Sequence, residues 1–496
     1  MRTVAAALAI TLAVAGPTSA QPAPGARPAV NVVFMEPNGA GPAGELPLYR
    51  RVEDPSRLAT LARWLDNEAA RWALELYARA RGIAVVHTAA RSQPAEYFVA
   101  LVPDADTAGV GFRLRTAAGI ESRPGVAYVQ VGPEEWRFST TLLHETGHVV
   151  LAMLAGGRVV AKRDIAAIPH TVAALTDRGT ALDEGFATSL ETLIAHLSAA
   201  PEVRARYRHE QFPVGPAAGM RAEYYRPSAD LLTYAQASAR YGDVRDNAFA
   251  FAPAFRGPDY LRVQTETARD RAALRDADQL LASEGFVASF FFTLFVRGDR
   301  SPGEETVRER ENAVMTALAT MLAGADRSPE APLLVDFVAG YGKVYPAGWP
   351  EVLDAFLDLS RGVFVDPGAA AMWRAHYLAA LGLDLARLGR ERIDGARERW
   401  RAAIQADPKT LYARLGPQIR CEAAGRTVAL VGLKIERPLT FDVNTVEEGV
   451  MRMVPGIAEA EVAAWQAERA KAPFADVADF KARSGLSPAS LASLRF

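Results

Sequence analysis

The chain has 496 residues, of which 50% are hydrophobic and 23% are charged, and its formal net charge is −2. This composition is typical of an ordinary globular protein, and the length is sufficient for two to four domains. Because the two signs of charge nearly cancel, the composition argues against the strongly basic class of nucleic-acid-binding proteins.

Residues 1–20 have the pattern of a secretory signal peptide. Arg2 provides a short positive region, residues 4–16 form an apolar run, and the small residues Thr18-Ser19-Ala20 precede Gln21 as a cleavage site. The apolar run is too short to span a bilayer, and no cysteine for lipid attachment follows it. We therefore expect an exported bacterial protein, periplasmic or secreted, with no membrane span in the mature chain.

Between the signal peptide and residue 131 the sequence predicts a mixed α/β lobe. A leader rich in proline, alanine and glycine covers residues 21–28, and one or two helices are predicted within residues 55–81. Runs of β-branched and aromatic residues predict four strands, at Val30 to Met35, Ile83 to Thr88, Tyr97 to Val102 and Val126 to Val131. We expect a small twisted sheet packed on helices.

The sequence HETGH at residues 144–148 has two imidazoles and a carboxylate at a spacing suited to a zinc site. Apolar residues at helical spacing predict a helix from Ser139 to Ala155, which a following pair of glycines can end. Residues four apart share one helix face, so His144 and His148 can bind one tetrahedral ion. Glu145 is expected to point toward the same cleft and take a proton from water. Gly147, inside a helix, indicates a close-packed neighbour.

Zinc needs a third protein ligand, and the metzincin continuation is absent because Val149 to Leu154 contains no donor. Glu184 lies 36 positions after His148, in a segment that predicts a second amphipathic helix. We interpret Glu184 as the third ligand. Two other carboxylates stay open as alternatives: Asp183 beside it, and Glu284 in a segment that echoes the Glu184 segment.

An HExxH motif followed by a helix that opens with Glu-Gly-Phe-Ala resembles the gluzincin zinc metallopeptidases, the group that includes thermolysin and aminopeptidase N. The resemblance covers about residues 120–200 of the 496 and implies a zincin-like fold. It also implies one Zn²⁺ per chain, held by His144, His148 and Glu184, with Glu145 as the general base.

The chain departs from the gluzincin pattern in three ways. The gap between the second and third ligands is longer, and no exopeptidase motif like that of aminopeptidase N precedes the helix. Thr188 stands four residues after Glu184, where thermolysin-like enzymes have an aspartate that orients a ligand histidine. Thr188 and Glu191 are therefore the candidates for that orienting role.

Two further features of a peptidase site are expected. An edge strand commonly aligns the substrate backbone in zinc peptidases, and Val126 to Val131 is the candidate strand. Amide hydrolysis also needs a donor that stabilises the oxyanion. The sequence does not select among six aromatic candidates: His170, His196, Tyr224, Tyr225, Tyr234 and Tyr241.

The predicted fold class is α+β. A zincin-like catalytic domain is expected over residues 21–300, an all-α accessory region over 304–436 and a tail over 440–496. A strand-forming stretch, Thr427 to Ile435, precedes the tail. Cys421 is the only cysteine, so no internal disulfide can form, and we interpret it as structural.

The tail contains Val454-Pro455-Gly456-Ile457 and Ser484-Gly485-Leu486-Ser487, and it resembles the paired helix-hairpin-helix modules of competence-type DNA receptors and type II secretion minor pseudopilins. In members that bind nucleic acid, hairpin glycines let backbone amides approach phosphate. Here Ala458 stands at the second glycine position, and eight acidic residues outnumber six basic ones. The acidic residues are Asp442, Glu447, Glu448, Glu459, Glu461, Glu468, Asp476 and Asp479, and the basic residues are Arg452, Arg469, Lys471, Lys481, Arg483 and Arg495. This balance favours a protein-contact or structural role over phosphate binding.

These features together predict an exported zinc metallopeptidase that acts on a peptide or protein substrate, with a protein partner for residues 440–496. Two rival functions remain at this point. One is a non-catalytic envelope scaffold, and the other is a DNA-binding protein that acts through the tail.

Overall fold

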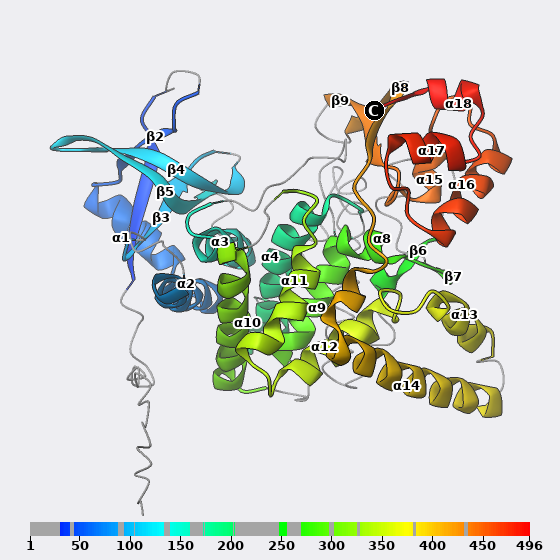
Figure 1. Ribbon diagram of the computed structural model, residues 1–496. Coiled ribbons are helices and arrows are strands. Elements are labelled where there is room, and N and C mark those ends of the chain that lie inside the picture. The colour runs from blue at the N-terminus through cyan, green and yellow to red at the C-terminus, as the bar shows by residue number, and fades with distance from the viewer. Residues whose placement is uncertain are drawn as a thin grey trace, which may run out of the picture.

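The computed structural model describes most of the chain after the leader (Figure 1). The predicted signal peptide and leader lie outside the described residues. No helix in the described part of the chain combines the length and apolar character needed to cross a membrane. The described residues are 30–39, 44–87, 94–103, 105–132, 139–158, 172, 174–201, 203, 248–254, 269–296, 302–324, 328–379, 383–430 and 435–496.

The N-terminal lobe is built on five strands, which close into a small barrel in the order β1-β2-β4-β5-β3. The strands β1 (Asn31–Pro37), β3 (Glu96–Leu101) and β5 (Gly119–Val131) are parallel neighbours. β4 (Asp106–Thr116) runs antiparallel to β5, and the short β2 (Leu48–Arg51) pairs with both β1 and β4.

Alternation along β3 shows why this sheet has two apolar faces. Tyr97 and Val99 join the core formed with the helices, whereas Phe98 and Ala100 join a separate core inside the barrel. Successive side chains of a strand point to opposite faces, so a strand buried on both sides is apolar throughout.

The predicted strand at Ile83 to Thr88 is wrong over Ile83 to His87, where α2 (Glu68–His87) continues, and Thr88 lies outside the described residues. Ala80 and Ala84, one helical turn apart, are completely buried, whereas Val86 is 76% exposed. Small side chains packed against the body of the protein therefore hold this segment as a helix, despite its β-branched residues.

Val126 to Val131 is a strand, as predicted, and forms the end of β5, but its predicted place at an edge of the sheet is wrong. Val129 to Val131 pairs with β3 on one side and with β4 on the other. β2 pairs with β4 only at Arg113 to Arg115, so over Asp106 to Val110 the described residues pair β4 with β5 alone. The open edge beside the helices therefore belongs to β4, which the sequence did not predict.

The helical body forms one continuous core with the α2 face of the sheet. Its centre is the stack of α3 (Ser139–Leu154), α4 (Arg178–Leu197) and α9 (Glu284–Val296). α4 is buried all round from Arg178 to Ala195, so it is not amphipathic as predicted. The surrounding elements are α1 (Pro55–Trp64), β6 (Phe251–Pro253), β7 (Arg269–Leu274), α8 (Ala277–Leu281), α10 (Glu304–Gly324), α11 (Leu333–Val344), α12 (Trp349–Ser360), α13 (Ala369–Ala379) and α14 (Leu383–Ala406).

Helices α10 to α14 share this core with α3, so they do not have an accessory core of their own. The C-terminal unit, residues 419–496, does have a separate core, which begins at Ile419 rather than at the predicted boundary of 440. The boundary moves because β8 and β9 pair with each other and β8 pairs with β10 at the end of the chain. The elements of the unit are β8 (Arg420–Leu430), β9 (Ile435–Asp442), α15 (Glu448–Met451), α16 (Glu459–Lys471), α17 (Val477–Arg483), α18 (Pro488–Ala492) and β10 (Leu494–Arg495).

The C-terminal unit docks on α8 of the body (Figure 1). Arg275, whose side chain is completely buried, donates from Nη2 to Glu447 Oε1 at 2.6 Å and from Nη1 to Ser283 Oγ at 3.0 Å. Gln279 Nε2 donates to the carbonyl of Thr445 at 3.1 Å. A buried ion pair therefore joins the two parts of the molecule.

Candidate metal centre

The helix that carries the HETGH sequence forms as predicted, from Ser139 to Leu154. Gly156 and Gly157 follow it with φ of 75° and 76°, and the amide of Gly157 donates to the carbonyl of Ala152 at 2.9 Å. A backbone conformation of this kind favours glycine, so the pair ends α3 as the sequence indicated.

Glycines set the spacing between α3, α4 and α9. A Cβ atom on Gly147 would lie 2.8 Å from Ala187 Cα, so the close neighbour predicted from this glycine is α4. On the opposite side of α4, a Cβ atom on Gly185 would lie 2.6 Å from Val287 Cβ of α9. The backbones of α3 and α4 can therefore approach closely at the histidine motif.

Three donor atoms converge between α3 and α4. His144 Nε2 and His148 Nε2 are 3.3 Å apart, and Glu184 Oε2 lies 3.5 Å from the first and 3.2 Å from the second. Nitrogen and oxygen ligands lie about 2.0–2.2 Å from zinc, so ligand atoms of a tetrahedral site are about 3.3–3.5 Å apart. The three atoms therefore have the separations of three corners of a zinc tetrahedron.

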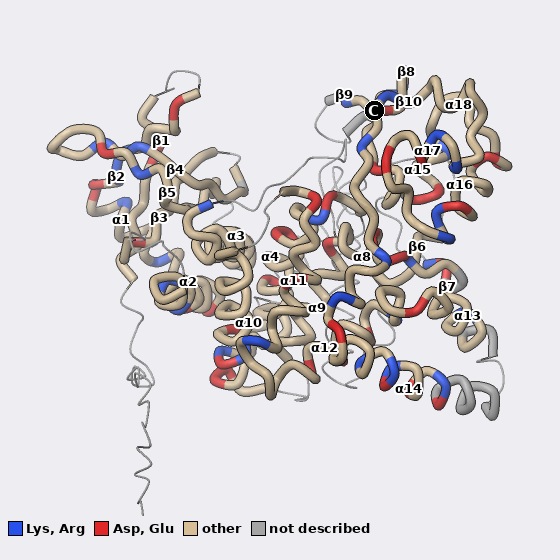
Figure 2. The backbone as a smooth tube through the Cα atoms, in the orientation of Figure 1, with Lys and Arg blue, Asp and Glu red and all other residues tan. Residues whose placement is uncertain are grey.

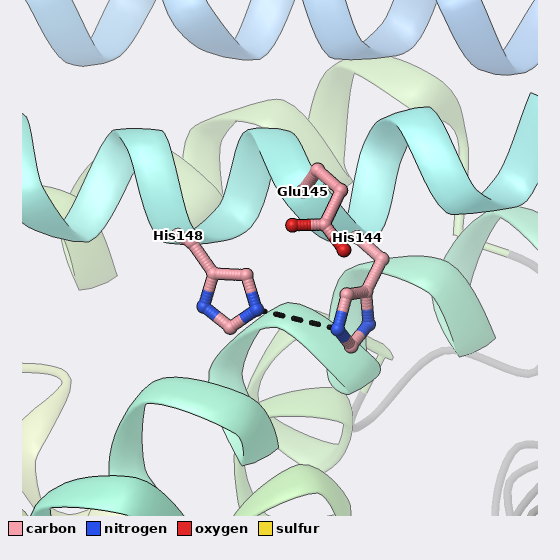
Figure 3. A group of neighbouring side chains, drawn as sticks. All are labelled: His144, Glu145 and His148. Carbon is pink, nitrogen blue, oxygen red and sulfur yellow. Dashed lines mark hydrogen bonds between the residues drawn. The ribbon is translucent and has the colours of Figure 1, made fainter. Parts of the chain in front are cut away.

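Glu145 is 4% exposed and comes from the same helix as the two histidines. Its carboxylate is directed into the gap between the two imidazole rings (Figure 3). One of its oxygens lies within 4.8 Å of the histidine nitrogens. This position allows it to exchange a proton with a water molecule held between the rings.

Asp183, one of the two alternative ligands, has a carboxylate oxygen within 4.8 Å of ligand atoms of His148 and Glu184. Asp183 Oδ2 is 3.0 Å from His148 Nδ1, on the ring edge opposite the converging nitrogen. Glu284, the other alternative, accepts a hydrogen bond from Thr188 Oγ1 at 3.3 Å, so the Thr188 proton goes to a carboxylate of α9. Of the two orienting candidates, Glu191 reaches an imidazole, with Oε2 at 3.5 Å from His144 Nδ1.

The site is buried and acidic. Burial by itself lowers the pKa of both imidazoles, but the nearby carboxylates of Glu184 and Glu191 raise the pKa of His144 well above its ordinary value. The charges of Asp183 and Glu184 likewise outweigh burial and raise the pKa of His148 to about 10. The surroundings therefore favour positive charge at this point, and a divalent cation would take the place of the protons.

A buried contact that the sequence did not reveal ties the sheet to the motif. The Tyr97 hydroxyl of β3 lies 2.6 Å from Thr146 Oγ1, which donates to the carbonyl of Leu142 at 2.6 Å. Burial raises the pKa of the Tyr97 phenol, so it remains a neutral hydrogen-bonding group. Such a contact depends on how β3 crosses α3. The hydrophobic periodicity of the sequence predicts each element but not their crossing.

Of the six predicted oxyanion donors, only His196 lies within the described residues, and it is far from the centre. It comes twelve residues after Glu184 on α4, about 18 Å along the helix axis. Its ring packs on Phe292 with ring centroids 5.6 Å apart. His170, Tyr224, Tyr225, Tyr234 and Tyr241 lie outside the described residues.

Comparisons of the chain with protein-family models, with curated proteins and with solved structures found no match.

Proposed function

We propose that this protein is a zinc-dependent metallopeptidase of the gluzincin type, exported to the periplasm or the cell exterior. The observation that carries the proposal is the convergence of His144 Nε2, His148 Nε2 and Glu184 Oε2 at 3.2–3.5 Å from one another. These three side chains fit a zinc ion because two imidazoles and one carboxylate are protein ligands known from catalytic zinc sites that keep an open position.

Each residue has a distinct part in hydrolysis. His144, His148 and Glu184 hold the ion, and a bound zinc supplies Lewis acidity that activates water and polarises the scissile carbonyl. Glu145 takes the proton from the attacking water and passes it to the leaving amine. Both histidines are largely buried, with side chains 18% and 11% exposed for His144 and His148.

The substrate backbone is expected to align along β4 rather than β5. Asp106 to Val110 is the open stretch of strand, and Ala108 and Val110 pack against the core that contains α3. An extended peptide can add to such an edge through backbone hydrogen bonds.

The C-terminal unit is proposed to contact protein rather than DNA. Glu461 accepts hydrogen bonds from the amides of Ala458 at 2.7 Å and Ser487 at 2.6 Å, at the starts of α16 and α18. In a phosphate-binding hairpin such amides would face the nucleic acid. Lys and Arg also lie beside Asp and Glu across the unit (Figure 2). A carboxylate in place of phosphate disfavours the DNA-binding alternative.

The experiment that tests the proposal is metal content by mass spectrometry of the purified mature chain, beside Glu184→Ala, Asp183→Ala and Glu284→Ala. We expect one zinc per wild-type chain and its loss in Glu184→Ala, with Glu284→Ala unchanged. Hydrolysis of a denatured protein substrate should follow the zinc content. A wild-type chain that takes up no zinc, even after incubation with it, would overturn the proposal and favour the scaffold alternative.

A further inference from the structure

α4 presents two adjacent carboxylates to a single imidazole. Glu184 Oε2 lies 3.2 Å from His148 Nε2, and Asp183 Oδ2 lies 3.0 Å from His148 Nδ1. Successive residues of an α-helix point in directions about 100° apart, so the two carboxylates meet opposite edges of the ring. The His148 ring is therefore bracketed between neighbouring residues of one helix.

The other histidine decides which edge of the ring faces the metal. His144 Nε2 lies 3.3 Å from His148 Nε2, on the side where Glu184 also converges. Asp183 is thus on the outer side of the His148 ring, and its side chain is only 4% exposed. Asp183 Oδ2 is at ion-pair distance from Nδ1, and the contact does not have the geometry of a hydrogen bond in the structure. The carboxylate also lies within 4.8 Å of a His148 nitrogen and a Glu184 oxygen, so a fourth-ligand role is the alternative that the test must separate.

We propose that Asp183 is a positioning residue that holds His148 with its proton on Nδ1 and Nε2 toward the metal. This inference rests on the proposed function and extends it to a residue outside the three ligands. An imidazole that binds through Nε2 carries its proton on Nδ1, and a buried N–H without an acceptor is costly. A carboxylate acceptor fixes the ring orientation and raises the basicity of the ligating nitrogen.

Asp183 is expected to contribute more to zinc binding than Glu191. The corresponding contact of Glu191 with His144 is longer, 3.5 Å, and His144 is more exposed than His148. Water can replace a partner of an exposed ring more easily than a partner of a buried ring. Loss of Asp183 should therefore weaken zinc binding more than loss of Glu191.

The test measures zinc affinity by competition with a chromophoric chelator, and the visible spectrum after Co²⁺ substitution. In Asp183→Ala we expect zinc affinity to fall about 10- to 100-fold and the Co²⁺ bands to shift, because the ring is no longer fixed. Asp183→Asn retains an oxygen acceptor and should recover part of the loss. Glu191→Gln should have a smaller effect than Asp183→Ala.

Thr188→Val is the matched control for general loosening of α4. Thr188 is buried on the same helix, one turn after Glu184, but its hydroxyl donates to Glu284. The zinc affinity of Thr188→Val should stay within about 3-fold of wild type, since the described hydrogen bond of this hydroxyl goes to Glu284 and not to a proposed zinc ligand. Equal losses in Thr188→Val and Asp183→Ala would overturn the inference. So would wild-type affinity and an unchanged Co²⁺ spectrum in Asp183→Ala. A wild type without zinc would instead defeat the proposed function.

Discussion

Carboxylates face imidazoles in the metal centre, whereas in the C-terminal unit they face arginines and backbone amides. Glu184 and Asp183 contact the two edges of His148, a ring that ligates metals when it is neutral. Glu447 instead pairs with the guanidinium of Arg275, and Glu461 accepts two backbone amides. Arginine stays charged at any physiological pH, so its pairs leave no role for a metal. The group that a carboxylate contacts thus separates a candidate metal ligand from a structural carboxylate.

The largest expected effect tests the proton-transfer role in the metal centre. Glu145→Gln removes the base but none of the three ligands, so zinc content should stay at the wild-type level. Peptide hydrolysis should fall about 10²- to 10⁴-fold, the usual contribution of a positioned base. Steady-state rates and metal content on the same preparation check this, with the exposed Glu305→Gln of α10 as control. Wild-type hydrolysis by Glu145→Gln would remove this residue from the mechanism.

The next effect concerns the buried ion pair of the C-terminal unit. Glu447→Ala leaves the guanidinium of Arg275 buried without its carboxylate, which should lower the free energy of unfolding by about 3–5 kcal/mol. Glu459→Ala is the control, because Glu459 pairs with Arg452 but its side chain is 72% exposed. Its loss should cost less than about 1 kcal/mol. Denaturant unfolding compares the two, and equal costs would show that the Arg275 pair does not hold the unit in place.

A smaller effect is expected where α3 meets α4. In Gly147→Ala the new methyl group would overlap Ala187, so α4 must move away, at a cost of about 1–3 kcal/mol. Glu184 moves with the helix, and zinc affinity should fall as well. Gly82→Ala is the control: Gly82 is exposed within α2 and a Cβ there meets nothing within 4 Å. That substitution should stabilise the chain by up to about 1 kcal/mol. A stabilised Gly147→Ala with unchanged affinity would contradict the close approach.

The smallest effect is a pH dependence in the C-terminal unit. Hydrogen bonds from the amides of Ala458 and Ser487 lower the pKa of Glu461 to about 2. Because the folded-state pKa is below the unfolded value, the ionised carboxylate stabilises the fold at neutral pH. That stabilisation is lost as the pH falls from about 5 toward 2. Glu461→Gln should therefore cost about 0.5 kcal/mol at pH 7, a low value because the side chain is partly solvated. The difference from wild type should shrink below pH 5, and a constant difference would show that the charge has no role.

The sequence predicts the parts of this centre that depend on one helix. Spacing along α3 gives both histidines, the terminating glycines and the close neighbour of Gly147. The sequence offers Asp183 only as a competing ligand, because its place at His148 Nδ1 depends on how α4 crosses α3. The hydrogen bond from Thr188 to Glu284 of α9 also depends on helix packing, which the sequence of α4 alone does not give.

The errors in predicting the fold from the sequence have a similar origin. The segment Ile83 to Thr88 has strand-like residues, but burial of Ala84 against the body decides its structure. The sequence places β5 at an edge because β4, interrupted by Gly109 and Gly111, does not show a strand pattern. Local residue preferences describe a segment alone, whereas pairing and packing depend on partners far along the chain.

Cys421, the only thiol of the chain, is 2% exposed on β8, inside the core of the C-terminal unit. Burial, together with the charge of Asp442, raises its pKa well above the ordinary value, so the thiolate that reacts with oxidants and alkylating reagents is scarce. Modification then requires the core around it to open. The rate at which a thiol reagent labels Cys421 in the folded chain therefore measures how often the core of the C-terminal unit opens. This measurement needs no added probe and does not depend on zinc.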